Sequence, residues 1–310
     1  MDAIVANYIS AERIKTILDY PTLIQYVERG LAHFSRRNEV GIFQPLRTSV
    51  HVRKSDGFLG CMPVYSEVDN ILATKLVTFF PNNKGDPTHN AVVMVFSAET
   101  GVPKAILDGE VITERRTAAA SAVATKHLAN ENSQILAVLG SGVQAKSHYA
   151  ALSEVLKFDQ VRIWNHRFQG AQRLATEIGE KCIACSSVQE AVLDADVIVT
   201  VTSSKVPILK AEWVKPGAHI NAVGACRPDW AEIDPELMRS AVVYADSYEG
   251  AARESGDILL SQAKVYAEIG EVINGTKEGY RDQVTVFKSL GIALEDAVAA
   301  KLVLDKLGLW

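Results

Sequence analysis

A glycine-rich turn between an apolar run and a helix-compatible segment is the feature that most constrains the fold. Residues 134–139 are typical of a buried strand, and residues 160–164 form a second strand-like run about twenty residues later. The turn between them reads Gly140-Ser141-Gly142-Val143-Gln144-Ala145. In a Gly-x-Gly-x-x-Ala turn the first glycine makes a tight bend, the second lets the backbone approach a pyrophosphate, and the small third residue packs helix against strand. An ordinary turn is the alternative, but the strand–helix–strand context predicts a dinucleotide-binding unit.

Composition narrows the class of protein. The chain has 310 residues, of which 48% are hydrophobic and 22% are charged, as in ordinary globular proteins of more than one domain. A formal net charge of −5 without a dense Lys/Arg run argues against nucleic acid as a partner. The apolar runs are too short for a membrane span, and the N-terminus lacks the apolar core of a signal peptide. We therefore expect a cytoplasmic protein that binds neither nucleic acid nor membrane.

The cysteines predict neither a disulfide framework nor a metal site. There are four in the chain, and the close pair is Cys182-x-x-Cys185. A second such pair, which a zinc site would need, is missing from the sequence. The pair lies in a short apolar-leaning segment that is typical of a strand, so we interpret both thiols as structural rather than as a redox pair.

The N-terminal part is predicted to form two helices followed by a sheet. Ser10 is placed to cap a helix over residues 11–18, and a second helix is expected to start at Pro21. The apolar face expected for the second helix consists of Leu23, Val27, Leu31 and Phe34. Strand patterns then follow one another without intervening helices, which predicts an antiparallel or mixed sheet. They cover residues 46–52, 58–62, 71–80, 90–96 and 102–107, the last two forming a hairpin.

The rest of the chain alternates between strand and helix. An Ala-rich helix over residues 113–129 comes first, and the alternation that follows predicts a parallel sheet covered by helices on both faces. The expected strands are 135–139, 160–164, 181–185, 197–201, 219–223 and 242–245. A final helix, 290–307, is expected to return to the first domain with a polar face that includes Glu295, Asp296, Lys301 and Asp305.

These patterns define the expected fold class and domains. The fold is α/β: a Rossmann-type doubly wound parallel sheet plus a discontinuous α+β domain. Residues 1–115 with 290–310 are expected to form a substrate-binding and dimerisation domain. Residues 116–289 are expected to form the NAD(P)-binding domain.

Several segments resemble the ornithine cyclodeaminase/mu-crystallin family. They are spread over nearly the whole chain and comprise residues 44–48, 74–79, 116–119, 140–145, 212–221, 227–230, 254–257 and 287–291. The resemblance implies a homodimer in which the discontinuous N-terminal domain supplies the dimer sheet and much of the substrate pocket. It also implies an NAD(P)H-dependent reductase of cyclic ketimines.

Reduction of a ketimine carboxylate requires a positive clamp for the carboxylate and a protonated imine nitrogen. Arg47, Lys75 and Arg116 are the candidates, although a solvent-facing charge on a strand is an equal alternative for Arg47 or Lys75 alone. Lys75 stands in an apolar strand, where a buried ammonium needs a partner or a function. Arg116 is expected near the start of the Ala-rich helix, where exposed amide groups add positive potential.

The resemblance places Arg47, Lys75 and Arg116 in the active site. Our hypothesis is that Arg47 and Arg116 hold the substrate carboxylate. Lys75 would lie near the imine, where it either relays a proton or stabilises charge, so Lys75 and Arg116 are the expected catalytic residues. Glu254 matches a substrate-side position of the family, with a surface glutamate as the alternative.

The residues at the end of the second strand of the parallel sheet indicate whether the cofactor is NAD(H) or NADP(H). An NAD enzyme usually has an acidic residue there, whereas this chain has Trp164-Asn165-His166-Arg167. Two side chains that can carry a positive charge favour a 2′-phosphate, so we expect NADPH, with NADH as the other candidate. In the mu-crystallin branch of the family Arg directly follows Asn, and here His166 intervenes.

The resemblance implies a wider set of cofactor-binding positions. His89 matches a position near the cofactor, with a surface loop histidine as the alternative. The full expected set is His89, Arg116, Thr117, Gly140, Ser141, Gly142, Val143, Gln144, Asn165, His166, Arg167, Thr200, Thr202, Val223 and Ser289.

One departure from the family bears on the reaction. Cyclodeaminases of the family carry an Asp shortly after the Val-Gly-Ala segment, and this chain has Cys226 there. A thiol is a poor substitute for a carboxylate base, and Asp229 lies three residues further on. This favours reduction of a ready-formed imine over ornithine cyclisation.

Alternative functions stay open at this point. One is an opine or alanine-type dehydrogenase that reduces an imine formed from a keto acid and an amine, and another is an ornithine cyclodeaminase-like enzyme. A third comes from another class, because the mu-crystallin branch of the family is known for binding thyroid hormone and for a structural role in the lens. An iodothyronine carboxylate would use the same arginine clamp.

Overall fold

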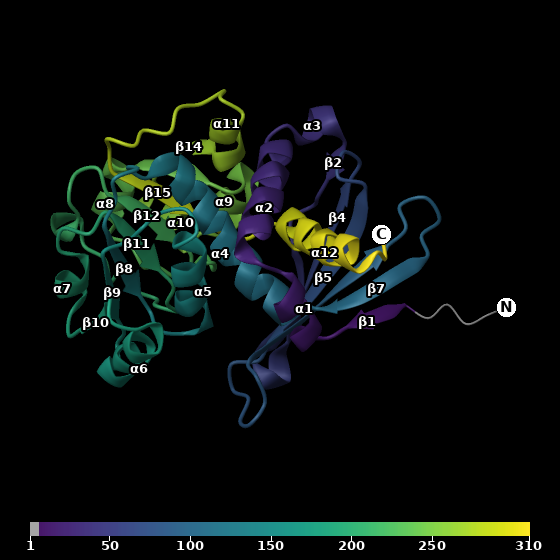
Figure 1. Ribbon diagram of the computed structural model, residues 1–310, viewed down its shortest axis with the longest axis horizontal. Coiled ribbons are helices and arrows are strands. Elements are labelled where there is room, and N and C mark those ends of the chain that lie inside the picture. Colours follow the sequence, from purple (N-terminus) through teal and green to yellow (C-terminus); the bar gives the residue numbers. More distant parts are fainter. Residues whose placement is uncertain (1–5) are drawn as a thin grey trace. The chain divides into compact units, whose positions relative to one another are not determined.

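The computed structural model describes residues 6–310, which divide into two compact units (Figure 1). The discontinuous unit comprises the chain up to Arg116 together with Ile292–Trp310. The parallel-sheet unit comprises Thr117–Gly291. Among the described residues, no helix combines the length and apolar character needed to cross a membrane.

The discontinuous unit is built on a mixed sheet, as predicted. Its strands follow the order β1-β7-β6-β5-β4-β2, with β3 also paired to β4. β1 runs parallel to β7 and the other pairs are antiparallel. The strands are β1 (Asn7–Ile9), β2 (Ile42–Phe43), β3 (Thr48–Val52), β4 (Gly57–Ser66), β5 (Ile71–Phe79), β6 (His89–Phe96) and β7 (Pro103–Asp108).

Helices pack on this sheet through apolar faces. Ser10 caps α1 (Ala11–Ile17) by accepting from the Arg13 amide, as predicted. The predicted face of α2 (Tyr20–Phe34) is buried, and α12 (Ala293–Leu307) packs against both α2 and β5 (Figure 1). The C-terminal helix therefore returns to the N-terminal part, as expected. α3 (Arg37–Val40) and the 3-10 turn η1 (Arg53–Ser55) complete the unit.

Two sequence-based expectations for this unit are wrong. The strand expected from Leu46 begins at Thr48, and every residue of β3 is exposed, so its alternation does not mark a buried face. α12 begins at Ala293 rather than residue 290, because the amides of Leu290 and Gly291 bond to the Asp246 carboxylate and Gly291 has φ +79°.

α4 (Gly109–Leu128) contains the boundary between the units after Arg116. The expected start at Thr113 is wrong by a full turn. The Asp108 carboxylate accepts hydrogen bonds from the amides of Glu110 and Val111 and so caps the helix at Gly109. Gly109 itself has no room for a side chain, because a Cβ there would lie 2.6 Å from the Ala91 backbone.

The parallel-sheet unit is a doubly wound sheet, as predicted. The strand order is β10-β9-β8-β11-β12-β15-β13-β14, with every pair parallel. β8 and β11 are neighbours whose connections run to opposite sides, which makes their carboxyl ends the topological switch point where ligands bind in such sheets. The strands are β8 (Ile135–Leu139), β9 (Gln160–Trp164), β10 (Cys182–Cys185), β11 (Val197–Thr200), β12 (His219–Ala222), β13 (Val242–Ala245), β14 (Val265–Glu268) and β15 (Thr285–Lys288).

Short helices connect these strands. They are α5 (Val143–Leu152), α6 (Phe168–Ile178), α7 (Val188–Val192), η2 (Ala211–Trp213), α8 (Pro235–Ser240), α9 (Tyr248–Glu254), α10 (Gly256–Ser261) and α11 (Ile269–Ile273). Apolar side chains of the central strands, such as Ile198, Ile220 and Val286, are fully buried in the core. The sequence analysis missed β14 and β15, which are short and end in a charged residue. β15 inserts between β12 and β13, so Lys288 and Ser289 reach the carboxyl edge of the sheet.

Candidate active site

A cluster of three cationic side chains lies in the discontinuous unit. Lys75 projects from β5 and is 3% exposed, while Arg116 on α4 is 4% exposed. Arg47 is half-buried and directly precedes β3. Arg116 and Arg47 are close enough to Lys75 to repel its positive charge. The structure thus brings together the three residues that the sequence analysis selected.

Two carboxylates from α12 balance this charge. Lys75 Nζ lies 2.8 Å from Asp296 Oδ2, and Arg116 Nε donates to Asp296 Oδ1 at 2.9 Å. Arg116 Nη1 donates to Glu295 Oε2 at 2.6 Å. Glu295 and Asp296 are 2% and 1% exposed, so the predicted polar face of the helix is buried at these two positions.

A sequence signal for the two carboxylates was present. Glu295 and Asp296 stand in the run Ala-Leu-Glu-Asp-Ala-Val-Ala-Ala, where apolar residues occupy every side of the helix. A helix that is apolar all round is buried, so acidic residues within it must also be buried and need partners. Arg116 lies about 180 positions away in the chain and Lys75 more than 200, and the sequence did not reveal either pairing.

Burial and neighbouring positive charges make it easier for the Lys75 ammonium to lose its proton. Burial is the main cause that lowers the pKa of Lys75, to about 8, and Arg116 adds to this effect. Asp296 acts in the opposite direction by favouring the charged form. A lysine of this kind can give up a proton near neutral pH, which is the property required of a general acid.

The helix-terminus argument for Arg116 is wrong. Because α4 begins at Gly109, Arg116 lies about two turns inside the helix, beyond the exposed amide groups of the first turn. Its positive potential comes from its own guanidinium. Thr117, the next residue, is buried.

The glycine loop follows β8 in the parallel-sheet unit, as predicted. Gly140 has φ +132°, and a Cβ there would lie 2.8 Å from the Val201 carbonyl oxygen. Gly142 is the N-cap residue of α5, and a Cβ on it would meet nothing within 4 Å. The open space before the helix N-terminus fits a phosphate group. Val143 is exposed beside it, and Ala145 is buried where the helix packs.

The segment after β9 adjoins this loop. Gly170 lacks the side chain that would collide with both Ser141 Oγ and Asn165 Nδ2, each 2.6 Å from its Cβ position. Asn165 donates to the Arg167 carbonyl oxygen at 3.0 Å. His166 and Arg167 are exposed, and neither has a side-chain hydrogen bond or ion pair with the described residues. These two side chains are available to a ligand.

A buried glutamate organises the carboxyl ends of β11 and β12. Glu232 Oε2 accepts from Thr200 Oγ1 and from the Gly224 amide, both at 2.8 Å. Its Oε1 accepts from the Thr202 amide at 2.6 Å and from Thr202 Oγ1 at 2.7 Å. Glu232 is fully buried, and burial raises its pKa. The sequence analysis did not identify Glu232.

A second buried ion pair supports this network. Asp257 Oδ1 accepts from the Glu232 and Ile233 amides, and its Oδ2 lies 3.1 Å from Lys288 Nζ. Lys288 ends β15 and is completely buried. The network therefore joins the carboxyl ends of three neighbouring strands. Val223, the residue after β12, is half-buried beside it.

Ser289 and Gln144 each have a buried polar atom that lacks a hydrogen-bond partner among the described residues. Ser289 Oγ, directly after β15, and Gln144 Oε1, in the first turn of α5, make no hydrogen bond. Buried polar groups normally have partners, so such atoms suit a bound polar ligand. Both belong to the predicted cofactor-binding set.

His89 and Glu254 lie in different units. His89 begins β6, and its ring centroid is 4.4 Å from that of Phe79. Partial burial lowers the pKa of His89. Glu254 ends α9 and is half-buried.

The cysteines have no redox geometry. Cys182 and Cys185 are free thiols in β10, and burial raises the pKa of each to about 11, which disfavours the reactive thiolate. Cys226 is exposed in the loop after β12, and Asp229 is exposed in the same loop.

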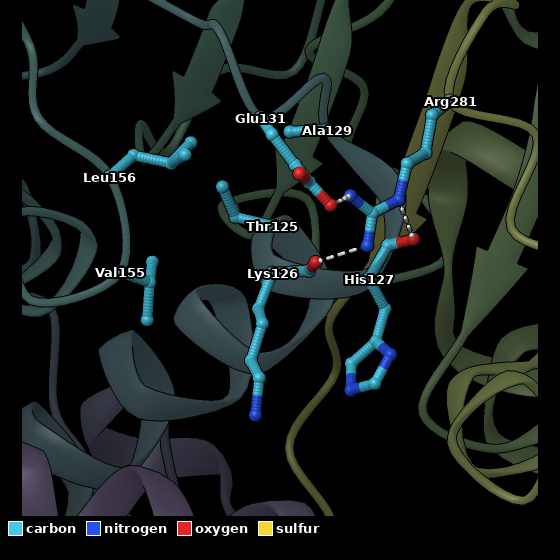
Figure 2. Close-up of a pocket in the computed structure, with 8 residues that line it drawn as sticks. All are labelled: Thr125, Lys126, His127, Ala129, Glu131, Val155, Leu156 and Arg281. Carbon is cyan, nitrogen blue, oxygen red and sulfur yellow. Dashed lines mark hydrogen bonds and ion pairs between the residues drawn. The ribbon is translucent and has the colours of Figure 1, made fainter.

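A cavity of about 340 Å³ lies at the end of α4 (Figure 2). Figure 2 shows Arg281 reaching across to the helix end, where it donates to the carbonyl oxygens of His127 and Lys126. Its remaining contact is an ion pair of 2.6 Å with Glu131. Arg281 therefore satisfies the terminal carbonyl groups of the helix.

Comparison with known proteins extends over almost the whole chain. The model of the Ornithine cyclodeaminase/mu-crystallin family matches residues 5–308. Ketimine reductase mu-crystallin of Rattus norvegicus is 52% identical over 301 residues, covering 96% of each chain.

Two solved structures share the fold of the whole chain. The Delta(1)-pyrroline-2-carboxylate reductase of Thermococcus litoralis, in complex with NADH and L-proline, gives a TM-score of 0.92 at 34% identity and covers 97% of each chain. An archaeal alanine dehydrogenase dimer with bound NAD gives a TM-score of 0.90 at 30% identity, covering 97% of this chain and 95% of that one. This protein belongs to the ornithine cyclodeaminase/mu-crystallin family.

Proposed function

We propose that the protein is an NADPH-dependent reductase of cyclic ketimine carboxylates. The observation that carries this proposal is the buried Lys75 between Arg47, Arg116 and Asp296, which combines an anion clamp with a proton donor. The relatives named ketimine reductase and pyrroline-2-carboxylate reductase support the same class of reaction. In this proposal the discontinuous unit binds the substrate, and the parallel-sheet unit binds the dinucleotide.

The charges of the cluster suit an anionic substrate. Arg47, Lys75 and Arg116 carry three positive charges when ionised, and Glu295 and Asp296 carry two negative charges. A substrate carboxylate would carry the charge opposite to that of these three cations. Arginine is suited to this task because its planar fork can hold a carboxylate through two hydrogen bonds. We assign the carboxylate to Arg47 and Arg116, with Glu254 as a further substrate-side residue.

Lys75 would complete the reduction at the imine nitrogen. NADPH, when bound, would supply a hydride to the imine carbon. The nitrogen must gain one proton in the same conversion of C=N to CH–NH. Lys75 holds that proton in a buried setting, and its lowered pKa favours release near neutral pH.

The parallel-sheet unit has the features that a dinucleotide requires. The α5 N-terminus with residues 140–144 would hold the pyrophosphate, and the exposed His166 and Arg167, with Asn165, would hold the 2′-phosphate. Ser289 Oγ offers an unpartnered hydroxyl to a polar group of the cofactor. The remaining cofactor-lining positions of the proposal are His89, Arg116, Thr117, Thr200, Thr202 and Val223.

A second candidate reaction is reduction of an imine formed in place from a keto acid and an amine. The similarity to the archaeal alanine dehydrogenase favours it over ornithine cyclisation. Cys226 replaces the carboxylate expected of a cyclodeaminase, which also counts against cyclisation.

The assay that tests the proposal follows nicotinamide absorbance with NADPH or NADH. Substrates are 1-piperideine-2-carboxylate, 1-pyrroline-2-carboxylate and a keto acid with ammonia. We expect turnover of the cyclic ketimines with NADPH preferred. Lys75→Met should reduce turnover by about 10²-fold or more while cofactor binding persists.

Other outcomes of this assay would change the assignment. Turnover confined to the keto acid with ammonia would favour the alanine-type reaction. Tight NADPH binding without turnover of any substrate would overturn the reductase and favour a binding protein. An iodothyronine would then be tested as a ligand of the same cations.

The proposal includes a homodimer in the cytoplasm. The solved archaeal relative is a dimer, and Val50 on the exposed β3 strand is 65% exposed, as an interface residue of a separated subunit would be. Free cysteines are typical of reducing compartments. Light scattering after size exclusion and cell fractionation test these two points.

A further inference from the structure

Asp296 lies at the centre of the buried charge cluster, and each of its oxygens serves a different cation. Oδ2 is 2.8 Å from Lys75 Nζ, and Oδ1 accepts from Arg116 Nε at 2.9 Å. Its neighbour Glu295 bonds to Arg116 Nη1 at 2.6 Å. The two adjacent carboxylates of α12 therefore have different contacts, although both face the same arginine.

The surroundings of Lys75 explain why the contact with Asp296 matters. Arg116 on α4 and Arg47 before β3 both oppose its charge, and burial removes the stabilisation that water would give. The residues that pair with Lys75 in the sheet, Met62 and Val93, are uncharged. Asp296 is the group from α12 that favours the ammonium.

A buried ion pair is not in itself a stabilising device, because desolvation of both charges offsets their attraction. A hydrophobic pair of the same volume would pack the region between β5 and α12 at lower cost. The arrangement is better explained by a requirement to keep one ammonium charged and fixed in position among other cations.

We propose that Asp296 is a positioning residue that keeps Lys75 protonated and fixes its Nζ for proton delivery to the imine nitrogen, whereas Glu295 positions Arg116 for the substrate carboxylate. This inference rests on the proposed function. The proton balance is simple: Lys75 gives one proton to the nitrogen as the hydride reaches the carbon, and the neutral amine is reprotonated from water. Asp296 stays ionised and stabilises the reformed ammonium.

The test compares Asp296→Asn with Glu295→Gln, two neutral replacements of nearly unchanged size on one helix. The pH dependence of kcat and the KM for 1-piperideine-2-carboxylate are measured for each. In the unaltered protein we expect kcat to fall as pH rises above about 8, because Lys75 loses its proton there. Protonation of the substrate itself is the same for all variants, so differences between their pH profiles reflect ionisable groups of the protein.

Asp296→Asn should move the basic limb of kcat to lower pH by about one to three units, because Lys75 loses its counter-charge while both arginines remain. Glu295→Gln should raise KM and leave that limb in place. An unshifted limb in Asp296→Asn, or equal shifts in both variants, would overturn the assignment. NADPH binding serves as the folding control.

A second comparison covers the case in which Asp296→Asn does not fold. Lys75→Met/Asp296→Asn removes both charges of the pair, and its residual activity is compared with that of Lys75→Met. Equal residual activities support a role of Asp296 through Lys75, whereas a further tenfold loss in the double variant overturns it. Absence of ketimine turnover by the unaltered protein would overturn the proposed function itself, which is a separate result.

Discussion

Gly140 and Gly142 of the loop after β8 are required for different reasons, and substitution of each can separate its role in the fold from its role in ligand binding. Gly140 is fixed by its own backbone, since its φ of +132° and the nearby Val201 carbonyl exclude a side chain. Gly142 has φ −84°, which alanine adopts readily, and open space where a methyl group would stand. The first glycine therefore serves the fold and the second is free to serve a ligand.

We predict that Gly140→Ala lowers the free energy of unfolding by about 1–3 kcal/mol. Gly142→Ala should change it by less than about 1 kcal/mol and weaken NADPH binding by roughly 5- to 150-fold, equivalent to about 1–3 kcal/mol of lost backbone contact. Urea unfolding and fluorescence titration measure the two quantities. Unaltered NADPH affinity in Gly142→Ala would remove the phosphate site from this loop.

For single residues, the sequence revealed the three cations of the buried cluster but not their pairing with the two carboxylates. Lys75 could be selected because its strand neighbours are apolar, and a buried ammonium is costly without a partner. The partner could not be selected, because Asp296 lies more than 200 positions away and only the fold brings it near. Glu232 was missed for a similar reason, because its donors Thr200 and Thr202 belong to the end of another strand and the loop that follows it.

Among the elements, the segments that follow β11 and β12 are joined by Glu232, which lies in the second of them, shortly before α8. Glu232 accepts four hydrogen bonds that join Thr200, Thr202 and Gly224. A side-chain amide at this position would turn a donor toward the backbone N–H groups and leave at least one of them without an acceptor.

Glu232→Gln is expected to lower the free energy of unfolding by about 1–3 kcal/mol. It should also weaken NADPH binding, if these loops line the cofactor. The matched control is Glu236→Gln, an exposed glutamate in the next helix, which should leave both quantities within error. Equal stability of Glu232→Gln and the unaltered protein would contradict the role described for the network.

The pattern of hydrophobic residues located most elements, and it failed where another interaction set the boundary. β8 and β13 begin and end at the predicted residues because uniform apolar runs mark buried parallel strands. α4 starts a turn early because of a side-chain cap at Asp108, which periodicity does not register. β14 and β15 were missed because each contains polar or charged residues and so lacks a uniform apolar run.

For the molecule as a whole, a fall in pH should first lower the stability of the parallel-sheet unit. His148 and His219 are fully buried there, and burial lowers the pKa of His148 to about 4 and that of His219 to about 3. Both stay neutral in the folded state, where His148 is bonded to Ser121 and the Gln144 carbonyl, and His219 to Thr285 and Asn221.

The unfolded chain binds protons at these histidines below about pH 6.5, and the folded chain does so only nearer pH 4. Stability is therefore complete above pH 6.5 and is lost as pH falls, by about 1.4 kcal/mol per pH unit for each histidine. Urea unfolding between pH 7 and pH 5 measures the slope. His148→Gln should reduce it by about half, whereas the exposed His166→Gln should not change it; equal slopes in all three proteins would contradict the argument.

Because the discontinuous unit is formed from both ends of the chain, the two units cannot complete folding in the order in which their first residues are synthesised. Lys75 and Arg116 leave the ribosome well before α12, and Thr117–Gly291 must be synthesised in between. At about 5–20 residues per second this interval lasts roughly 10–35 s. During it the two cations have no carboxylates from α12 to pair with, so the strands around them cannot reach their final packing. The nascent discontinuous unit must wait, while the parallel-sheet unit, one continuous stretch of chain, can fold as soon as it emerges.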